Sequence, residues 1–318
     1  MLEPIKRGRL TGVEAALQVK GLASGIKKGN RIALAKGITL AENDPVGASK
    51  LLAQIGPPGK AFVVGITGPP GTGKSSLIDR LIEAYRKEGL RVGVIAVDPS
   101  SPITGGALLG DRIRMSDHAG DMKVFIRSMA SRGWSGGLSR ATSQVIRLMD
   151  AAGYDLILLE TVGIGQADIE VVGVSHAVLV ILMPGLGDDI QVSKAGLMEI
   201  GDIYVVNKSD LEGADVMVVN LLSLFRGGSR SPPVLKVSAL SGEGIDRLHD
   251  AIEKIRRSFI AGDDDLRLKS VRGMIIETAR GAAMERLASV SESKAEVLAR
   301  QVLAGKTTIE AAAARLSA

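Results

Sequence analysis

Short runs of apolar, often β-branched residues alternate along the centre of the chain with longer segments of mixed polarity. The runs have apolar residues at consecutive positions rather than at every second position. This pattern is typical of strands buried on both faces, and connections long enough for helices favour a mostly parallel sheet covered by helices. We therefore predict an α/β fold with strands at Ala61–Thr67, Arg91–Asp98, Met122–Ser128, Asp155–Glu160, Ala177–Met183, Ile203–Asn207 and Val234–Ser238.

The two ends of the chain have helical spacing instead. Within residues 10–56, Asp44 followed by Pro45 is a typical helix start. Beyond Gly262, Thr307 and Glu310 fit a capping box, in which a Thr and a Glu three residues apart open a helix. The expected parts are a helical N-terminal arm over residues 1–58, an α/β core over residues 59–262 and a helical C-terminal arm over residues 263–318.

The amino-acid composition excludes several classes of function. The chain of 318 residues has no cysteine, which excludes a disulfide scaffold, a Cys-ligated metal site and a thiol nucleophile. Its three histidines are far apart in sequence, so a dedicated transition-metal carrier is hard to build. The N-terminus lacks the apolar centre of a secretory signal, and no apolar run reaches the ~18 residues of a spanning helix. We expect a cytoplasmic protein that does not enter a membrane.

The charge is uneven along the chain. The net charge is +5, and residues 1–60 alone carry +6. A basic segment attracts nucleic acid or an acidic partner. Aromatic residues make up only 3% of the chain, which leaves almost no platform for stacking bases. Nucleic-acid binding is therefore not expected.

A glycine-rich segment between a predicted strand and a predicted helix matches the phosphate-binding pattern G-x-x-x-x-G-K-[ST]. In such a loop the backbone N–H groups surround the β-phosphate, the lysine spans the β- and γ-phosphates, and the Ser/Thr hydroxyl binds Mg²⁺. A chance match in a turn is the alternative, and the flanking elements argue against it. The nucleotide-binding residues expected here are Gly68, Pro69, Pro70, Gly71, Thr72, Gly73, Lys74, Ser75 and Ser76.

Two further motifs at strand ends predict recognition of guanine. In the N-K-x-D sequence of Asn207, Lys208 and Asp210, the last carboxylate accepts from guanine N1–H and N2–H₂, a pair of donors that adenine lacks. Downstream, Ser238, Ala239 and Leu240 would place a backbone N–H against guanine O6. A polar turn at the end of a strand is the alternative. The order of the motifs favours GTP over ATP.

Three carboxylates are candidate Mg²⁺ ligands. Asp98 and Glu160 each end a predicted strand, and Asp111 lies in a segment flanked by glycines. Because Mg²⁺ takes only one or two carboxylates with waters and phosphates, some of the three would act through bound water. A carboxylate that merely caps a strand is the alternative for each. The glycines after Glu160 suit a loop that moves with the γ-phosphate.

Several blocks of sequence resemble the MeaB/ArgK family of P-loop GTPases, which are G-protein chaperones of adenosylcobalamin-dependent methylmalonyl-CoA mutase. The resemblance runs almost end to end. The matching blocks are DPSSP (98–102), GGALLGDRIRM (105–115), FIRS with SRGWSGGLSRAT (125–142), ETVGIGQ (160–166), PGLGDDIQ (184–191) and NKSD (207–210).

The resemblance implies a P-loop fold of the signal-recognition and MinD-like branch, slow GTP hydrolysis that a partner accelerates, and a homodimer. It implies catalytic or Mg²⁺ roles for Lys74, Ser75, Asp98, Asp111 and Glu160, and a mobile loop over residues 184–196. In that loop Lys194 would reach the nucleotide when a partner is bound. The implied partner is methylmalonyl-CoA mutase or a related acyl-CoA mutase. The family's loop is closer to GDELQGIKKG, whereas this chain has GDDIQVSKAG.

Three other functions are weighed against this one. A kinase or ATPase that serves amino-acid transport is the other label of the family, and the N-K-x-D motif speaks against ATP. A nickel- or cobalt-type metallochaperone GTPase needs Cys or His clusters, which this chain lacks. A binding module with a degenerate nucleotide site is disfavoured because the catalytic positions are intact.

Overall fold

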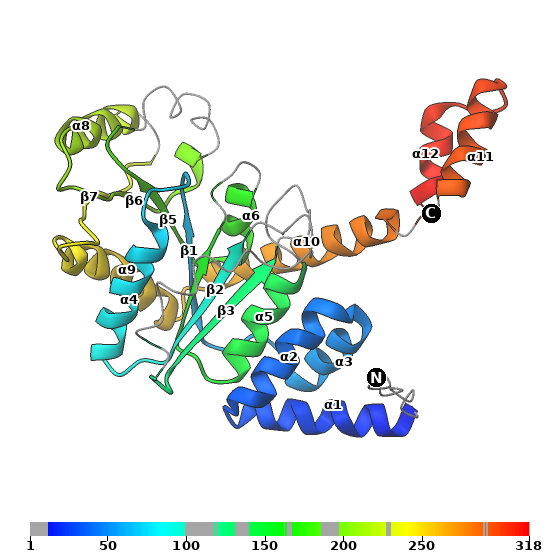
Figure 1. Ribbon diagram of the computed structural model, residues 1–318, viewed down its shortest axis with the longest axis horizontal. Coiled ribbons are helices and arrows are strands. Elements are labelled where there is room, and N and C mark those ends of the chain that lie inside the picture. Colours follow the sequence, from blue (N-terminus) through cyan, green and yellow to red (C-terminus); the bar gives the residue numbers. More distant parts are fainter. Residues whose placement is uncertain are drawn as a thin grey trace, which may run out of the picture.

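The strands form one parallel sheet in the order β3-β2-β4-β1-β5-β6-β7 (Figure 1). The computed structural model describes residues 12–98, 118, 120–130, 140–161, 163, 167–185, 197–226, 230–288, 290 and 292–317. The predicted α/β fold is confirmed, and each predicted strand is present to within two residues. The strands are β1 (Phe62–Thr67), β2 (Val92–Asp98), β3 (Val124–Ala130), β4 (Leu156–Glu160), β5 (Ala177–Leu182), β6 (Ile203–Val206) and β7 (Val234–Lys236).

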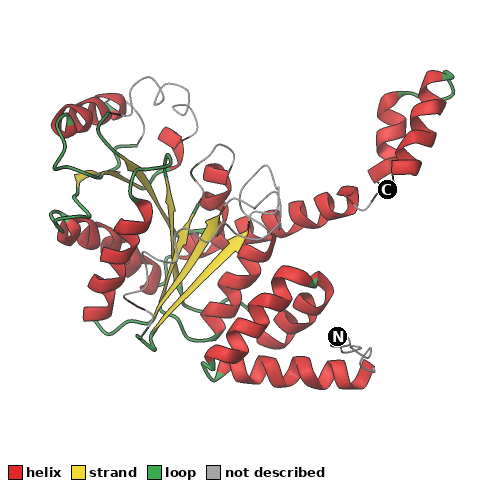
Figure 2. Cartoon of the chain, in the orientation of Figure 1, coloured by secondary structure: helices red, strands yellow, loops and turns green. Residues whose placement is uncertain are grey.

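Alternate residues of each central strand enter two separate hydrophobic cores. All six residues of β1 are buried, with Val64 and Ile66 facing one core and Val63 facing the other. Because both faces are apolar, helices cover both (Figure 2). The first core lies beneath α4 (Lys74–Lys87) and α9 (Ile245–Ile260), and the second beneath α5 (Arg140–Ala151), α6 (Ala167–Val174) and α8 (Ala214–Phe225).

Three N-terminal helices pack on the outside of α5. They are α1 (Gly12–Lys27), α2 (Arg31–Asn43) and α3 (Pro45–Ile55). The predicted helix start at Asp44 is confirmed, because its carboxylate accepts a hydrogen bond from the Gly47 N–H at 2.9 Å and Pro45 is the first helical residue. Ile26, Leu34 and Ile38 are fully buried in the second core. These helices therefore share a core with the sheet.

The C-terminal helices are arranged differently. The first, α10 (Asp264–Ala288), runs across α6 and α5, and α11 (Glu292–Leu303) and α12 (Ile309–Ser317) lie beyond its far end (Figure 1). The predicted cap of α12 is one residue early: Thr308, not Thr307, accepts from the Ala311 N–H at 3.2 Å. No helix in the described part of the chain is both long and apolar enough to cross a bilayer.

Glycines allow the elements between the sheet and α10 to approach closely. A Cβ on Gly65 of β1 would lie 2.5 Å from Val171 of α6, and a Cβ on Gly273 of α10 would lie 1.7 Å from the carbonyl oxygen of Gly173 in α6. The α6 and α10 backbones are thus in direct contact where they cross. Helix α6 connects the sheet to the helix that carries the C-terminal segment.

Candidate nucleotide site

The loop between β1 and α4 has the backbone shape that its glycines permit. Gly68, Gly71 and Gly73 have positive φ angles of 137°, 79° and 85°. A Cβ on Gly68 would lie 2.0 Å from the carbonyl oxygen of Ile181, and a Cβ on Gly73 would lie 2.5 Å from Nδ2 of Asn207. Any side chain at these two positions would therefore collide. The loop opens directly into the N-terminus of α4, where backbone N–H groups favour an anion.

Lys74, the first residue of α4, lies across this loop. Its Nζ donates hydrogen bonds to the carbonyl oxygens of Gly68 at 2.8 Å and Pro69 at 3.2 Å, and the side chain is buried. The Thr72 hydroxyl also donates to Pro69, at 2.9 Å, and thereby tightens the loop. Pro70 and Gly71 are exposed at the tip, and Ser76 is exposed in the first turn of α4. The sequence-predicted phosphate residues are therefore assembled on one loop and helix start.

Ser75 and Glu160 meet beneath the loop. The Ser75 hydroxyl donates to Oε1 of Glu160 at 2.8 Å, and both side chains are buried. They meet because β4 pairs with β1, with Glu160 in register with Ile66. Asp98 ends β2, the neighbour of β4 on its other side, although its side chain lies outside the described part. Asp111, Lys194 and most of the 184–196 loop lie outside the described residues.

The segment after β4 lies against the phosphate loop. Thr161 donates its backbone N–H to the Ile66 carbonyl at 3.0 Å and its hydroxyl to the Thr67 hydroxyl at 3.0 Å. A Cβ on Gly163 would lie 2.0 Å from the Gly68 carbonyl oxygen and 2.7 Å from Nζ of Lys74. Sequence reasoning assigned the glycines here to loop motion and missed this close approach. A side chain at position 163 would push the two loops apart.

Asn207 joins the phosphate loop to the predicted base site. Its Nδ2 donates to the Thr72 carbonyl at 2.8 Å, and its Oδ1 accepts from the Ala239 N–H at 3.1 Å. The Asn207 side chain is buried, so both bonds are shielded from water. The Ser238 N–H donates to the Glu243 carbonyl at 3.0 Å and the Ala239 N–H to Asn207, so the Leu240 N–H is the donor of this tripeptide that remains for the predicted guanine site.

Asp210 is positioned as a hydrogen-bond acceptor. The Ser238 hydroxyl donates to Oδ1 of Asp210 at 2.6 Å, and this bond lowers the pKa of Asp210, so the exposed carboxylate stays ionised at neutral pH. Lys208 has a positive φ of 56°, an uncommon conformation for a residue with a side chain, and it turns the chain between Asn207 and Asp210. The structure thus brings Asp210 and Ser238 together from two separate strand ends.

Arg80 is a member of this site that sequence reasoning missed. Its Nε donates to the Ala239 carbonyl at 2.9 Å, and its Nη2 donates to the Leu240 carbonyl at 3.0 Å. The guanidinium therefore fixes the loop at 239–240 to α4. An arginine on the outer face of an amphipathic helix gives no sequence signal, because most such residues are simply solvated.

Comparison with known proteins matches this site to a family. Residues 34–294 match the family described as Methylmalonyl Co-A mutase-associated GTPase MeaB. The chain belongs to this family of GTPases. Its phosphate loop, its Ser75–Glu160 pair and its N-K-x-D segment lie within the matched residues.

Individual relatives support the same family. A Pyrococcus horikoshii protein that is named as a GTPase is 51% identical over 240 residues, which are 73% of this chain and 76% of that protein. GTPase ArgK of Escherichia coli is 38% identical over 260 residues, 78% of each chain. The mouse protein named Methylmalonic aciduria type A homolog, mitochondrial, is 36% identical over 272 residues, 77% of this chain and 65% of that protein.

A solved structure gives the same fold. It is titled LAO/AO transport system kinase, has a TM-score of 0.70 and 26% identity, and the match covers 98% of both chains. This MeaB-family chain is therefore a P-loop GTPase, as the sequence predicts.

Proposed function

We propose that this GTPase controls the loading of adenosylcobalamin into methylmalonyl-CoA mutase, or a related acyl-CoA mutase, and protects that enzyme. The description of its family names the mutase, and the name of the mouse relative refers to methylmalonic aciduria. The structural observation that carries the proposal is the backbone contact between Gly173 and Gly273. Helix α6 follows the loop after Glu160 and contacts α10, which leads to the C-terminal helices. Loss of the γ-phosphate would displace that loop, and α6 would transmit the displacement to α10.

Lys74 and the phosphate loop would bind the β- and γ-phosphates. In this proposal Nζ of Lys74 exchanges its bonds to the Gly68 and Pro69 carbonyls for phosphate oxygens. Water then attacks the γ-phosphorus, the bond to the β–γ bridging oxygen breaks, and that oxygen leaves on GDP. The ammonium stabilises the charge that develops on the leaving oxygen.

The Ser75–Glu160 pair fits a Mg²⁺ site. A buried hydroxyl and a buried carboxylate, 2.8 Å apart at the N-terminus of α4, provide the hard oxygen donors that this ion takes. We propose Ser75 and Glu160 as the residues that hold it, with Asp98 and Asp111 as further carboxylates. When bound, the ion would neutralise charge on the phosphates.

The guanine assignment is tested with Asp210→Asn. The variant loses an acceptor for N1–H and N2–H₂ but presents an amide donor, so GTP should bind about tenfold to a hundredfold more weakly and xanthosine triphosphate more tightly. Asp250→Asn, an exposed change on α9, is the matched control and should bind GTP like wild type. Calorimetric titration with GTP, XTP and ATP measures all of these affinities. Equal binding of ATP and GTP by wild type would contradict the assignment.

The partner is tested by mixing the chain with an adenosylcobalamin-dependent mutase, once with GDP and once with a non-hydrolysable GTP analogue. We expect different mutase affinities in the two states, and by linkage the mutase should change nucleotide affinity by the same factor. The mutase should also accelerate GTP hydrolysis, through the 184–196 loop and Lys194. The chain should form a homodimer in this complex. Identical affinities and unchanged turnover would contradict the proposal.

A second candidate is phosphoryl transfer to another protein, since the solved structure that resembles this chain is titled as a transport system kinase. The two candidates differ in where the γ-phosphate goes. With γ-labelled GTP, a GTPase releases all of the label as inorganic phosphate, whereas a kinase places it on a protein. Retention of label on a protein of a transport system would favour the second candidate.

A further inference from the structure

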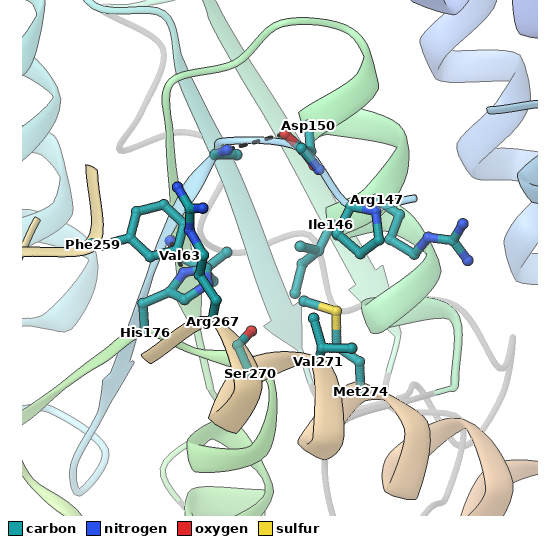
Figure 3. A pocket seen from close by; sticks show the side chains of 13 residues that line it. Val63, Ile146, Arg147, Asp150, His176, Phe259, Arg267, Ser270, Val271 and Met274 are labelled. Carbon is teal, nitrogen blue, oxygen red and sulfur yellow. Dashed lines mark hydrogen bonds between the residues drawn. The ribbon is translucent and has the colours of Figure 1, made fainter. Parts of the chain in front are cut away.

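A cavity lies at the edge of the sheet opposite the nucleotide site. It has a volume of about 180 Å³, is partly open to solvent, and is lined by the start of β1, the residue before β5, the last turns of α5 and α9, and the first turns of α10 (Figure 3). The GTPase chemistry described above uses none of its residues. Its apolar walls are Ala61, Val63, Ile146, Phe259, Val271 and Met274.

The volume limits the size of any ligand. An engineered apolar cavity of about 150 Å³ holds one benzene molecule, so 180 Å³ accommodates about six or seven non-hydrogen atoms. A nucleotide or a coenzyme is too large to lie wholly within it. The occupant is therefore a small molecule with an apolar part that contacts Val63, Ile146 and Met274.

The polar side chains of the cavity offer hydrogen-bond donors. Ser270 is 1% exposed, and its hydroxyl, which points into the space between β1 and α5 in Figure 3, has no hydrogen-bond partner among the described residues. Nε of Arg267 is likewise buried and without a hydrogen-bond partner in the described part of the chain, and its guanidinium lies over the Phe259 ring, 5.3 Å from the centroid. The Arg147 guanidinium instead donates to the Gly56 carbonyl at 2.6 Å. A buried polar group without a partner destabilises the folded state, and a ligand acceptor would remove that cost.

His176 provides another hydrogen-bond donor, whereas the Asp150 carboxylate already accepts hydrogen bonds from the backbone. Nδ1 of His176 accepts from the Val63 N–H at 2.9 Å, so the neutral ring carries its proton on Nε2. Asp150 accepts hydrogen bonds from the backbone N–H groups of Gly59, Lys60 and Ala61. The remaining polar groups that face the cavity, Ser270, Arg267 and Nε2 of His176, are thus donors, one of them a guanidinium group, and they match an anion.

We propose that this cavity binds a small organic carboxylate with an apolar body of three or four carbons. The carboxylate would accept from Ser270 and Arg267, and the carbon chain would lie against Val63, Ile146 and Met274. Since Ser270 and Met274 belong to α10 and the other apolar contacts to the core, the ligand would hold the start of α10 against the sheet. The inference is independent of the proposed mutase partner.

Binding is tested with the full-length chain saturated with GDP, so that the phosphate loop is occupied. Isobutyrate is the probe, isobutyramide its neutral isostere, and inorganic phosphate the anion without an apolar body. Calorimetry should show one saturable isobutyrate site and at least about tenfold weaker binding of the other two, because charge-assisted hydrogen bonds and apolar burial are both needed. Hydrogen exchange should slow at residues 267–274 when isobutyrate is added.

Variants locate the site. Arg267→Gln and Ser270→Ala should each weaken isobutyrate binding, the former by about tenfold or more, whereas Arg272→Gln on the exposed side of α10 should leave it unchanged. Unchanged GDP affinity verifies that each variant is folded. The proposal is overturned by an absence of saturable isobutyrate binding, by equal binding of phosphate, or by binding that neither cavity variant changes.

Discussion

The N-terminal and C-terminal helices flank the same sheet but are held in different ways. In the first group, Ile26, Leu34 and Leu51 are completely buried and belong to the core of the sheet. In the second, Leu303 is 89% exposed and Ile275 is 64% exposed. Among the described residues of the second group, the buried ones are few, with Ser270 and Met274 in the first half of α10, Gly281 further along it and Ala312 in α12. The first group also exposes Leu17, Ile32 and Val46, but it completes a core, whereas the second group exposes large apolar side chains along most of its length.

This difference indicates distinct roles. Helices that share a core with the sheet move with it as one body, because close-packed interiors transmit displacement. Helices with exposed apolar residues along their length present a surface that another chain can cover. We therefore place the proposed dimer and partner contacts on α10 to α12 rather than on α1 to α3. If burial determines how firmly each group is held, equivalent substitutions in the two groups should change the free energy of unfolding by different amounts.

The largest expected difference is in the cost of removing an apolar side chain. Leu34→Ala in α2 deletes a side chain with 0% exposure and should lower the free energy of unfolding by about 2–5 kcal/mol. Ile276→Ala in α10, where the side chain is 48% exposed, should change it by less than about 1 kcal/mol. Urea unfolding of both variants measures the two values. Similar losses would mean that α10 is packed as firmly as α2.

A second difference should appear with pH. Burial, assisted by Lys269 and Arg267 of α10, lowers the pKa of His176 to about 4, from about 6.5 in the unfolded chain. The unfolded state therefore binds more protons between these values, and stability falls as pH decreases from 6.5 to 4, by about 3 kcal/mol in total.

His176→Asn tests this pH dependence. The Asn side chain keeps an acceptor for the Val63 N–H but does not titrate, so the variant should lose less stability than wild type between pH 7 and pH 4.5. Urea unfolding at the two pH values gives the comparison. Parallel losses in the two proteins would show that folding does not change the pKa of His176.

The sequence predicted the sheet well for a physical reason. Consecutive apolar residues fit strands buried on both faces, and β1, β4 and β5 are buried at every position. The phosphate and base motifs could be located in the sequence because each is a short segment whose glycines or polar side chains have a local role, and nucleotide binding by these residues stays a prediction. The cap of α12 was misplaced from Thr308 to Thr307 because adjacent threonines have the same capping chemistry, and tertiary packing decides between them.

Contacts between distant segments could not be predicted. The crossing of Gly173 and Gly273 joins two glycines that are far apart in the chain, and neither lies in a turn motif. Arg80 binds the Ala239 and Leu240 carbonyls through a helix-to-loop contact that exists only in the folded chain. The buried donors around Ser270 have no hydrogen-bond partner among the described residues. They come together only because three elements meet at one edge of the sheet.

Replacing a helical glycine with alanine should have opposite effects on stability in α10 and in α1. Gly273→Ala places a Cβ 1.7 Å from the Gly173 carbonyl oxygen, so α10 must move away from α6, at a cost of about 1–3 kcal/mol. Gly21→Ala in α1 meets nothing within 4 Å and should stabilise the protein by up to about 1 kcal/mol through helix propensity. Urea unfolding gives both values, and hydrogen exchange should be faster in α10 only for Gly273→Ala. Stabilisation by both changes would contradict the close crossing.

The smallest expected difference concerns ion pairs. Arg127 of β3 pairs with Glu42 of α2, with side chains 23% and 13% exposed, whereas Arg300 pairs with Glu296 within α11, with side chains 76% and 63% exposed. Water screens the second pair, so its coupling in a double-mutant cycle should be about 0.3–0.5 kcal/mol and should decrease in high salt. The Arg127–Glu42 pair is shielded and bridges two elements, so we expect a coupling of about 1 kcal/mol or more with less salt dependence. Equal coupling energies in the two cycles would show that the Arg127–Glu42 pair does not stabilise the packing of α2 on the sheet more than a surface ion pair would.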